Sequence, residues 1–267
     1  MPNIHRITPD KKVHFKDLST RGKDFASDRE ATEKEFQELR KEIDLLQESF
    51  FAEGKRKLLV LFQAMDTGGK DGTVRDVFSG VNPHGIAVTS FKAPTPEELS
   101  HDYLWRIHRA VPGNGMIGVF NRSQYEDVLV ARVESLVPEE VWQARYDQIN
   151  EFEKLLTNTG TTILKFFLHI SEEEQKQRLE ERLTERRKQW KFSLEDLKKR
   201  KDWKKYMQAY DDILERCTTH HAPWYVIPAD QKWYRNYAVA KVVAHTLREI
   251  KPQFPELPAG AKNIQIQ

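Results

Sequence analysis

The chain has 267 residues, of which 31% are charged, and its formal net charge is +2. This length allows one large α/β domain or two small ones with a substantial core. A single cysteine, Cys217, excludes an intrachain disulfide, and no apolar run reaches the roughly 20 residues that span a bilayer. The first residues lack the apolar segment of a signal peptide. We therefore expect a cytoplasmic protein without membrane contact.

The predicted elements alternate between helices and short apolar strands. After an irregular arm, apolar residues three or four positions apart predict a helix over residues 27–53. Short, nearly continuous apolar runs then predict strands covered on both faces. These runs are residues 57–63, 86–91, 116–120, 161–170 and 224–228. Helices between them, one with the capping box Thr95-Pro96-Glu97-Glu98, complete an α/β fold with a parallel five-stranded sheet flanked by helices.

The simplest organisation is one core with two extensions. We predict an N-terminal arm and helix over residues 1–53, a core over 54–250 and a peripheral tail over 251–267. A basic helical insertion at about 175–205 belongs to the core.

A glycine-rich segment directly follows the first predicted strand. Its residues are Ala64-Met65-Asp66-Thr67-Gly68-Gly69-Lys70-Asp71-Gly72-Thr73. Such a turn exposes backbone N–H groups to an anion, and the next helix adds the positive end of its dipole. Lys70 stands where the phosphate-binding lysine of a P-loop stands. A plain strand-turn-helix with glycines is the alternative.

The match to the P-loop motif is incomplete. Ala64 replaces the first glycine, and Asp71 replaces the Ser or Thr that reaches Mg²⁺. Asp66 is unusual in such a loop, because a carboxylate repels phosphates unless a cation intervenes. We interpret it as a Mg²⁺ ligand or as a base on the acceptor side.

The third predicted strand ends in the polar segment Asn121-Arg122-Ser123-Gln124-Tyr125-Glu126-Asp127. Polar residues at the carboxyl end of such a strand lie where open α/β sheets bind ligands. Arg122 is predicted to clamp a phosphate, Glu126 and Asp127 to hold a metal ion, and Arg132 to face the same groove. The alternative is a charged helix N-terminus, where acidic residues are favoured in any case.

Residues 178–205 carry twelve basic and six acidic side chains. Arg178, Arg182 and Arg186 are four positions apart and share one helix face. A solvated basic face would account for this run by itself. Beside a phosphate loop, however, it is typical of the Arg-rich lid that P-loop kinases close over phosphates. Arg106 and Arg109, on the helix after the second strand, form a second candidate anion-binding surface.

Together these segments resemble the polyphosphate kinase 2 family. The loop AMDTGGKDGT, the helix YLWRIHRAVP, the strand end FNRSQYEDVLVARV and the basic lid occur in the family's order, and the similarity spans about residues 36–250. The resemblance implies a P-loop kinase core similar to thymidylate kinase. Such a protein moves the terminal phosphate of inorganic polyphosphate to a nucleotide with Mg²⁺.

The resemblance also implies roles for individual residues. Asp66 and Lys70 are expected at the transferred phosphate, with Arg122 at the strand end and Arg178 and Arg182 in the lid. We assign phosphate, polyphosphate or nucleotide binding to a further set of residues. They are Thr67, Gly68, Gly69, Asp71, Gly72, Thr73, Arg75, Arg106, Arg109 and Arg132.

One departure from the family pattern concerns the acceptor. Many members have Asp where this chain has Asn121, and neutral or basic residues where Glu126 and Asp127 stand. The combination resembles the class III branch, which implies AMP and ADP as acceptors, with GMP and GDP as further candidates. We hypothesise that the acidic pair recruits an extra Mg²⁺ for acceptors with different numbers of phosphates. The family also implies a homo-oligomer, with a tetramer as the candidate.

Two other functions share part of this pattern. An ATP-dependent nucleoside monophosphate kinase would have the same loop, lid and sheet, but Asp66 and the missing Ser or Thr after Lys70 oppose it. A non-enzymatic nucleic-acid-binding protein would grip phosphates with the basic insertion and show tight, salt-sensitive binding without phosphotransfer. We predict no nucleic-acid partner.

Overall fold

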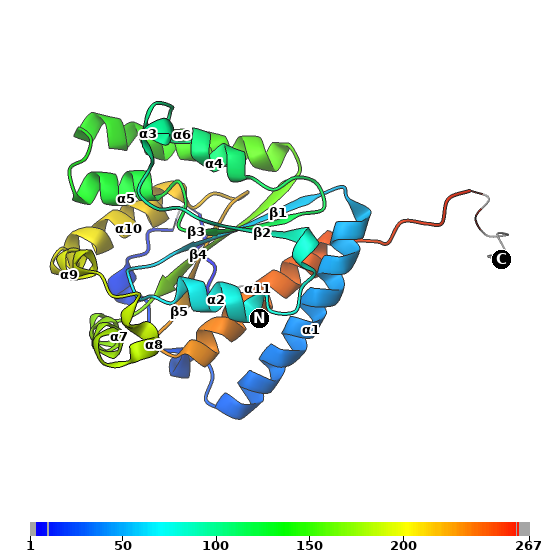
Figure 1. Ribbon diagram of the computed structural model, residues 1–267, viewed down its shortest axis with the longest axis horizontal. Coiled ribbons are helices and arrows are strands. Elements are labelled where there is room, and N and C mark those ends of the chain that lie inside the picture. Colours follow the sequence, from blue (N-terminus) through cyan, green and yellow to red (C-terminus); the bar gives the residue numbers. More distant parts are fainter. Residues whose placement is uncertain (1–3, 10, 260, 262–267) are drawn as a thin grey trace.

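The computed structural model describes residues 4–9, 11–259 and 261, and Figure 1 shows a central sheet with helices on both faces. The five strands pair in parallel in the spatial order β2-β3-β1-β4-β5. They are β1 (Lys57–Gln63), β2 (Ile86–Ser90), β3 (Ile117–Asn121), β4 (Thr161–His169) and β5 (Trp224–Pro228). The predicted parallel five-stranded α/β fold is confirmed, with each strand end within one residue of its expected position.

Helices connect and cover the strands. They are α1 (Arg29–Glu53), α2 (Lys70–Val77), α3 (Pro96–Leu99), α4 (Trp105–Ala110), α5 (Glu126–Val133), α6 (Glu139–Asn158), α7 (Glu172–Thr184), α8 (Arg186–Gln189), α9 (Leu194–Lys201), α10 (Trp203–Cys217) and α11 (Lys232–Ile250). Helix α1 begins two residues later than predicted, because the Asp28 side chain caps it by accepting from the N–H of Ala31. The capping box between Thr95 and Glu98 is present at α3.

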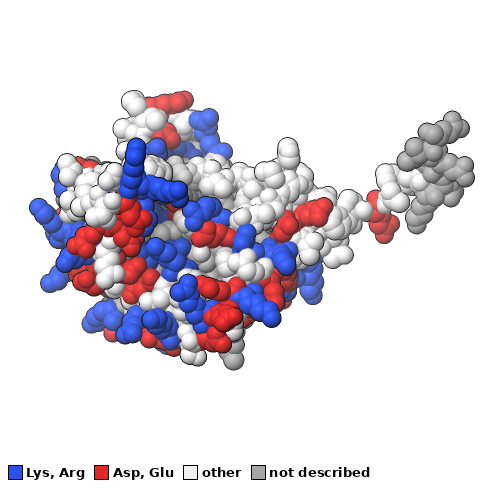
Figure 2. All heavy atoms as spheres, turned by 60° about the horizontal axis from the view of Figure 1, so that its bottom comes forward, with Lys and Arg blue, Asp and Glu red and all other residues white. Residues whose placement is uncertain are grey.

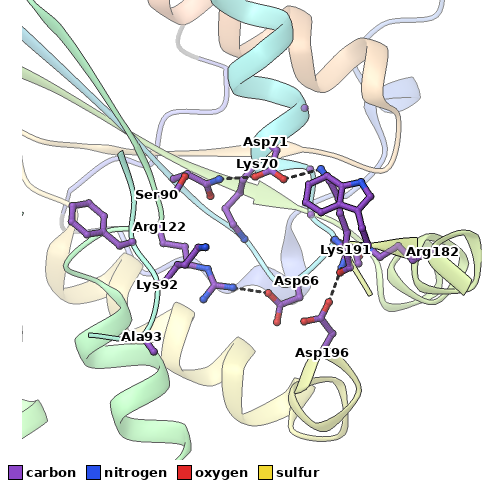
Figure 3. A pocket seen from close by; sticks show the side chains of 17 residues that line it. Asp66, Lys70, Asp71, Ser90, Lys92, Ala93, Arg122, Arg182, Lys191 and Asp196 are labelled. Atoms are coloured by element: carbon purple, nitrogen blue, oxygen red, sulfur yellow. Dashed lines mark hydrogen bonds and ion pairs between the residues drawn. The ribbon is translucent and has the colours of Figure 1, made fainter. Parts of the chain in front are cut away.

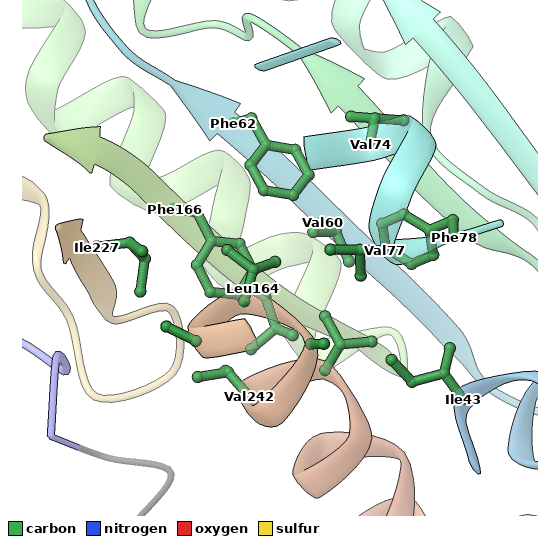
Figure 4. Packing of buried hydrophobic residues seen from close by; sticks show 14 of the residues in the cluster. Ile43, Val60, Phe62, Val74, Val77, Phe78, Leu164, Phe166, Ile227 and Val242 are labelled. Atoms are coloured by element: carbon green, nitrogen blue, oxygen red, sulfur yellow. The ribbon is translucent and has the colours of Figure 1, made fainter. Parts of the chain in front are cut away.

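Alternate residues of β1 point into two separate hydrophobic layers. Leu58, Val60 and Phe62 pack in the layer with α1, α2 and α11, part of which Figure 4 shows. Leu59 and Leu61 pack on the other face of the sheet, with α5, α6 and α10. Each of these five side chains is at most 1% exposed. Burial on both faces explains why the strand is continuously apolar in sequence.

The N-terminal arm packs against the sheet layers. Arg6 forms an isolated bridge with Tyr225 of β5. Phe15 lies in a 3₁₀ turn, is 2% exposed and contacts the rings of Phe167 and Tyr210. At the other end, residues 251–259 form no helix or strand and lead away from the body in Figure 1. The rest of the predicted tail, apart from residue 261, lies outside the described residues.

The position of β1 determines where the two predicted phosphate-binding segments lie. β2 and β3 lie on one side of β1, and β4 and β5 lie on the other. Phe62 and Asn121 are partners in the ladder between β1 and β3, so the loops after these strands emerge side by side. In open parallel sheets ligands bind at such an edge, where the chain switches sides.

A buried polar network lies close to this edge. The Lys165 side chain on β4 is 0% exposed and donates to Glu153 of α6 at 2.6 Å, to the Tyr125 hydroxyl at 2.8 Å and to the carbonyl oxygen of Cys217 at 2.6 Å. Glu153 also accepts from Tyr125 and from Gln124. The network therefore ties α6, β4 and the end of α10 to the loop that follows β3.

Replacing Lys165 is expected to destabilise the fold strongly. Lys165→Met would leave the buried Glu153 carboxylate without its cation, which costs about 3–5 kcal/mol of unfolding free energy. Urea unfolding measures the loss. Lys176→Met, which breaks the exposed pair with Glu180, is the control and should change the free energy by less than about 1 kcal/mol. A loss at Lys165 no larger than in the control would contradict this account.

Candidate active site

The loop between β1 and α2 forms a tight turn. Thr67 and Gly69 have φ angles of 65° and 98°, in the left-handed region, and Gly69 is the N-cap of α2. A Cβ at Gly69 would lie 1.9 Å from Nη1 of Arg235, and one at Gly68 would lie 2.5 Å from the Cβ of Ala64. Glycine is therefore needed at both positions. The bare backbone leaves room for an anion at the start of the helix.

This loop borders a cleft of about 520 Å³, drawn in Figure 3. Five basic and three acidic side chains line the cleft, which gives it a positive excess. The ionisable lining residues are Asp66, Lys70, Asp71, Lys92, Arg122, Arg182, Lys191 and Asp196. The other lining residues are Thr67, Gly68, Gly69, Gly72, Ser90, Phe91, Ala93, Asn121 and Trp190. A glycine loop opposite several cations suits a ligand with more than one phosphate group.

The face of the molecule in Figure 2 carries no continuous basic patch. On the face of the molecule in Figure 2, basic and acidic side chains are interspersed, and the chain as a whole has a net charge of only +2. A protein that grips nucleic acid non-specifically needs a continuous basic surface. This face gives that alternative no support.

Asp66 and Arg122 face each other at the base of the cleft. Nη2 of Arg122 donates to Oδ1 of Asp66 at 3.0 Å, and Nζ of Lys199 lies 3.9 Å from the other carboxylate oxygen. Burial alone would raise the pKa of Asp66, but Lys70 and Arg122 outweigh it and hold that pKa below its usual range. Asp66 is therefore a charged carboxylate at neutral pH, surrounded by cations.

Lys70 is the first residue of α2. Its Nζ donates to the carbonyl oxygen of Ala64 at 2.9 Å, which folds the side chain back across the loop. Burial, and then the nearby charge of Arg122, lower the pKa of Lys70 to about 8. The hydroxyl oxygen of Thr67, in the same loop, is buried without a protein partner. Lys70 is thus placed to exchange this carbonyl oxygen for an oxygen of a bound phosphate, and the Thr67 hydroxyl has no competing protein partner.

The predicted lid corresponds to α7, α8 and α9, and its side chains pair both with one another and with the loop. Nη1 of Arg182 donates to Oδ2 of Asp196 at 2.7 Å. Nζ of Lys191 donates to Oδ2 of Asp71 at 3.0 Å, and Nδ2 of Asn121 donates to Oδ1 of the same residue at 2.6 Å. Asp71, which replaces the usual Ser or Thr, therefore connects the loop to both the lid and the end of β3.

Arg178 is predicted to act from the lid on a phosphate in the cleft, but the structure places its side chain outside the cleft lining. Its side chain is 6% exposed and does not line the cleft. Nη1 donates to the carbonyl oxygen of Thr67 at 3.0 Å and Nη2 to that of Ala229 at 2.6 Å, while Nε donates to Glu174. Because its guanidinium N–H groups already donate to these acceptors, Arg178 holds the backbone of the loop in place and does not face the cleft.

Three other predicted residues also lie away from the cleft lining. Arg132 donates to Asp212 and to the Tyr146 hydroxyl at 3.2 Å, in the layer with α6 and α10. Arg75 points outward and pairs with its neighbour Asp76 at 2.8 Å. Thr73 is fully buried, and its hydroxyl donates to the carbonyl oxygen of Gly69. The structure therefore brings none of them to the cleft.

Arg106 and Arg109 line a neighbouring groove of about 480 Å³. This groove shares residues 90–93 with the main cleft, so the two are adjacent. Arg106 donates to the carbonyl oxygen of Lys92 at 2.8 Å, and Arg109 stacks on the ring of Trp105. The two arginines thus extend the basic lining beyond the main cleft.

Glu126 and Asp127 face different neighbours. Oε2 of Glu126 lies 3.6 Å from Nη1 of Arg122, and Oε1 accepts a hydrogen bond from Nε2 of Gln63. Glu126 also lines a small cavity beside Asp66. Asp127 instead faces Arg106 and Arg145, at 3.9 and 3.6 Å. Successive residues on a helix do not share a face. The structure therefore does not bring the predicted acidic pair together around one ion.

Several cleft residues were not predicted as site residues. Ser90 ends β2 and Lys92 follows it, and their place at the carboxyl end of a predicted strand was a usable signal. Lys191 belongs to the basic run but is indistinguishable there from its solvated neighbours. Trp190 and Asp196 carry no motif, and only the folding of the lid brings them to the cleft.

The donor set near Asp66 fits a magnesium ion that is shared with a substrate. Mg²⁺ is usually held by one or two carboxylates together with substrate phosphates and waters. Asp66 supplies a charged carboxylate, and Glu126 lines the cavity next to it. Among the described residues there is no group of three or more His, Cys, Asp or Glu side chains suited to hold a metal. A cage made of protein ligands alone is thus not present in this part of the chain.

Comparison with known proteins identifies the family. The profile of the family described as Polyphosphate kinase 2 (PPK2) matches residues 26–255. The chain belongs to the polyphosphate kinase 2 family. This confirms the family that the loop, the strand end and the basic lid predict. In the described residues, no helix is long and apolar enough to cross a membrane.

Individual relatives in the polyphosphate kinase 2 family are similar over most of their length. The AMP/ADP-polyphosphate phosphotransferase of Meiothermus ruber is 48% identical over 268 residues, 98% of this chain and 99% of that protein. The ADP-polyphosphate phosphotransferase of Rhodopseudomonas palustris is 44% identical, over 82% of this chain and 80% of its own. The crystal structure of polyphosphate kinase 2 from Arthrobacter aurescens TC1 has a TM-score of 0.93 at 39% identity, covering 98% and 94% of the two chains.

Proposed function

We propose that this protein transfers the terminal phosphate of inorganic polyphosphate to AMP and to ADP, forming ADP and ATP. One observation carries the proposal: a P-loop-type turn and a basic lid face each other across one positively charged cleft. The family and the name of the Meiothermus ruber relative support it. GMP and GDP are further candidate acceptors of the same kind.

In the proposed reaction, an oxygen of the acceptor's terminal phosphate attacks the end phosphorus of the polyphosphate. The bond from that phosphorus to the bridging oxygen breaks, and the shortened chain leaves with this oxygen. Lys70 and the loop N–H groups hold the transferred phosphate, while Arg122 and Arg182 neutralise its equatorial oxygens. Lys92, Lys191 and the arginines of the neighbouring groove hold the remaining anionic groups.

Mg²⁺ is the proposed cofactor. Asp66 is the first candidate ligand and Glu126 the second, because the two line the same cavity. When bound, the ion would neutralise charge on the phosphates. Arg122 orients Asp66 through their hydrogen bond, and Lys199 approaches the carboxylate from the lid.

We also propose a cytoplasmic location and a homo-oligomeric state, with a tetramer as the candidate. The location is supported by the single cysteine, Cys217, which is buried and unpaired in the described structure. The oligomer rests on the family alone. Size-exclusion chromatography with light scattering would measure the assembled mass directly.

The proposed function is tested by offering AMP and ADP separately to the purified protein with Mg²⁺ and long-chain polyphosphate. Chromatography of the nucleotides is expected to show ADP and ATP from AMP, and ATP from ADP. Conversion of ADP alone would remove AMP from the proposal. Transfer from ATP with none from polyphosphate would mean that the protein is an ordinary nucleoside monophosphate kinase.

The proposed reaction should lose efficiency in alkaline solution. Lys70 has a pKa of about 8 in the free protein, so it is charged below this pH and neutral above it. Since kcat/KM reports the free enzyme, it should be steady near neutral pH and fall about tenfold per unit above pH 8. The same decline is expected with AMP and with ADP. A flat profile to pH 10, with circular dichroism showing a folded protein, would exclude this role of Lys70.

A further inference from the structure

A buried arginine lies behind the phosphate loop, on the side away from the cleft. Arg235 belongs to the first turn of α11 and is 2% exposed. Its guanidinium fills the space where a Cβ of Gly69 would stand, with Nη1 only 1.9 Å from that position, and Nη2 lies 3.5 Å from the corresponding position at Gly72. The loop backbone is thus packed directly against this cation.

The hydrogen bonds of Arg235 are unusual for a buried cation. Its Nε and Nη2 donate to the amide oxygen of Asn236, at 3.1 and 2.8 Å. Asn236 in turn donates to Oδ2 of Asp76 in α2 at 2.9 Å. Among the ion pairs of the described residues, none includes Arg235. A buried charge normally requires a direct partner of opposite sign, so the structure keeps this charge here without one.

A second buried cation, Arg178, lies nearby, and it has a direct partner in Glu174 at 2.7 Å. Nη1 of Arg178 lies 3.6 Å from the position that a Cβ of Gly69 would take. The same nitrogen donates to the carbonyl oxygen of Thr67. Burial, and then the repulsion from Arg178, lower the pKa of Arg235 to about 9. The guanidinium still carries its charge at neutral pH. Two positive groups thus lie against the rear of a turn whose front faces the cleft.

We propose that Arg235 is a positioning residue of the phosphate loop, which packs against the Gly69–Gly72 backbone and places a positive charge without a direct carboxylate partner behind the bound phosphate. An anion in the cleft would supply a countercharge across one layer of backbone, while the guanidinium itself is buried. Arg235 does not line the cleft, so it acts through the loop. The reaction-based part of this inference rests on the proposed function.

The experiment compares Arg235→Met, Arg235→Lys and wild type. Arg248→Met is the control, because Arg248 lies on the same helix, is exposed and pairs with Glu42. For each protein, kcat and KM for polyphosphate are measured with ADP, and the affinity for inorganic tripolyphosphate is measured by calorimetry without acceptor. Thermal unfolding shows whether each variant is folded.

We expect Arg235→Met to lose about 10²-fold in kcat/KM and at least about tenfold in tripolyphosphate affinity while remaining folded. Arg235→Lys keeps the charge but not the planar fork, and it should lie between Arg235→Met and wild type. Arg248→Met should stay within about twofold of wild type in both measurements. If Arg235→Met does not fold, the tripolyphosphate affinity of Arg235→Lys tests the proposal in its place. A reduced affinity in this folded variant supports the proposal.

Two results would overturn the inference. In the first, both Arg235 variants bind tripolyphosphate and turn over like wild type. In the second, activity falls only in proportion to the folded fraction, with kcat/KM per folded molecule unchanged. If wild type transfers no phosphate at all, the proposed function fails, and the tripolyphosphate affinities alone still decide the role of Arg235.

Discussion

Lys70→Ala is expected to lower kcat for phosphate transfer about 10³-fold with both AMP and ADP. Lys70 lies at the point where the loop meets α2, and its amine can move from the carbonyl oxygen of Ala64 to a phosphate oxygen. Removing it withdraws a positive charge from the group being transferred, where little covalent chemistry compensates. Nucleotide chromatography under single-turnover conditions measures the loss.

Lys41→Ala is the matched control for Lys70→Ala. Lys41 is exposed on α1, and its replacement should leave kcat within about twofold of wild type. Both variants should keep the circular dichroism spectrum of the wild type. If Lys70→Ala retained more than a tenth of the activity, the loop would not hold the transferred phosphate as proposed.

Asp66→Asn is expected to reduce turnover about 10²–10³-fold. The amide oxygen can still accept from Arg122, so the main change is the loss of the negative charge. If Asp66 holds Mg²⁺, more of the ion will be needed for half-maximal activity, because a neutral amide is a weaker ligand for a hard cation. Titration of activity with MgCl₂ separates this effect from a simple loss of active protein.

The control for Asp66→Asn is Asp147→Asn, on the exposed side of α6. It should need the same Mg²⁺ concentration as wild type. A lower rate in Asp66→Asn with an unchanged Mg²⁺ requirement would mean that Asp66 acts on the acceptor or on Arg122 and is not a metal ligand.

Local sequence patterns were sufficient to predict the sheet and the floor of the cleft. The run at Lys57–Gln63 is apolar because both faces of β1 are covered, and its predicted bounds match the structure. The glycine loop and Arg122 follow neighbouring strands, so parallel pairing alone places them together. These features depend on contacts within one strand-loop-helix unit or on the general geometry of parallel sheets.

The directions of the arginines could not be predicted in the same way. Arg178 and Arg182 are four positions apart on α7, yet the first supports the loop from beneath and the second lines the cleft. Which of the two arginines reaches the cleft depends on the tertiary packing of α7. Arg132 likewise has the expected spacing, but Asp212 of α10 draws it away. Arg235 carried no motif at all.

The lid differs from the rest of the molecule in how it is held in place. Neither α8 nor α9 contains a buried residue, whereas the sheet and the long helices contribute two extensive hydrophobic layers. Substitutions in these short helices therefore change unfolding free energy little. Most sequence changes in these two helices can therefore occur without compensating mutations in the core. In this segment, only the side chains that reach the cleft, such as Lys191 and Asp196, are tied to the proposed reaction.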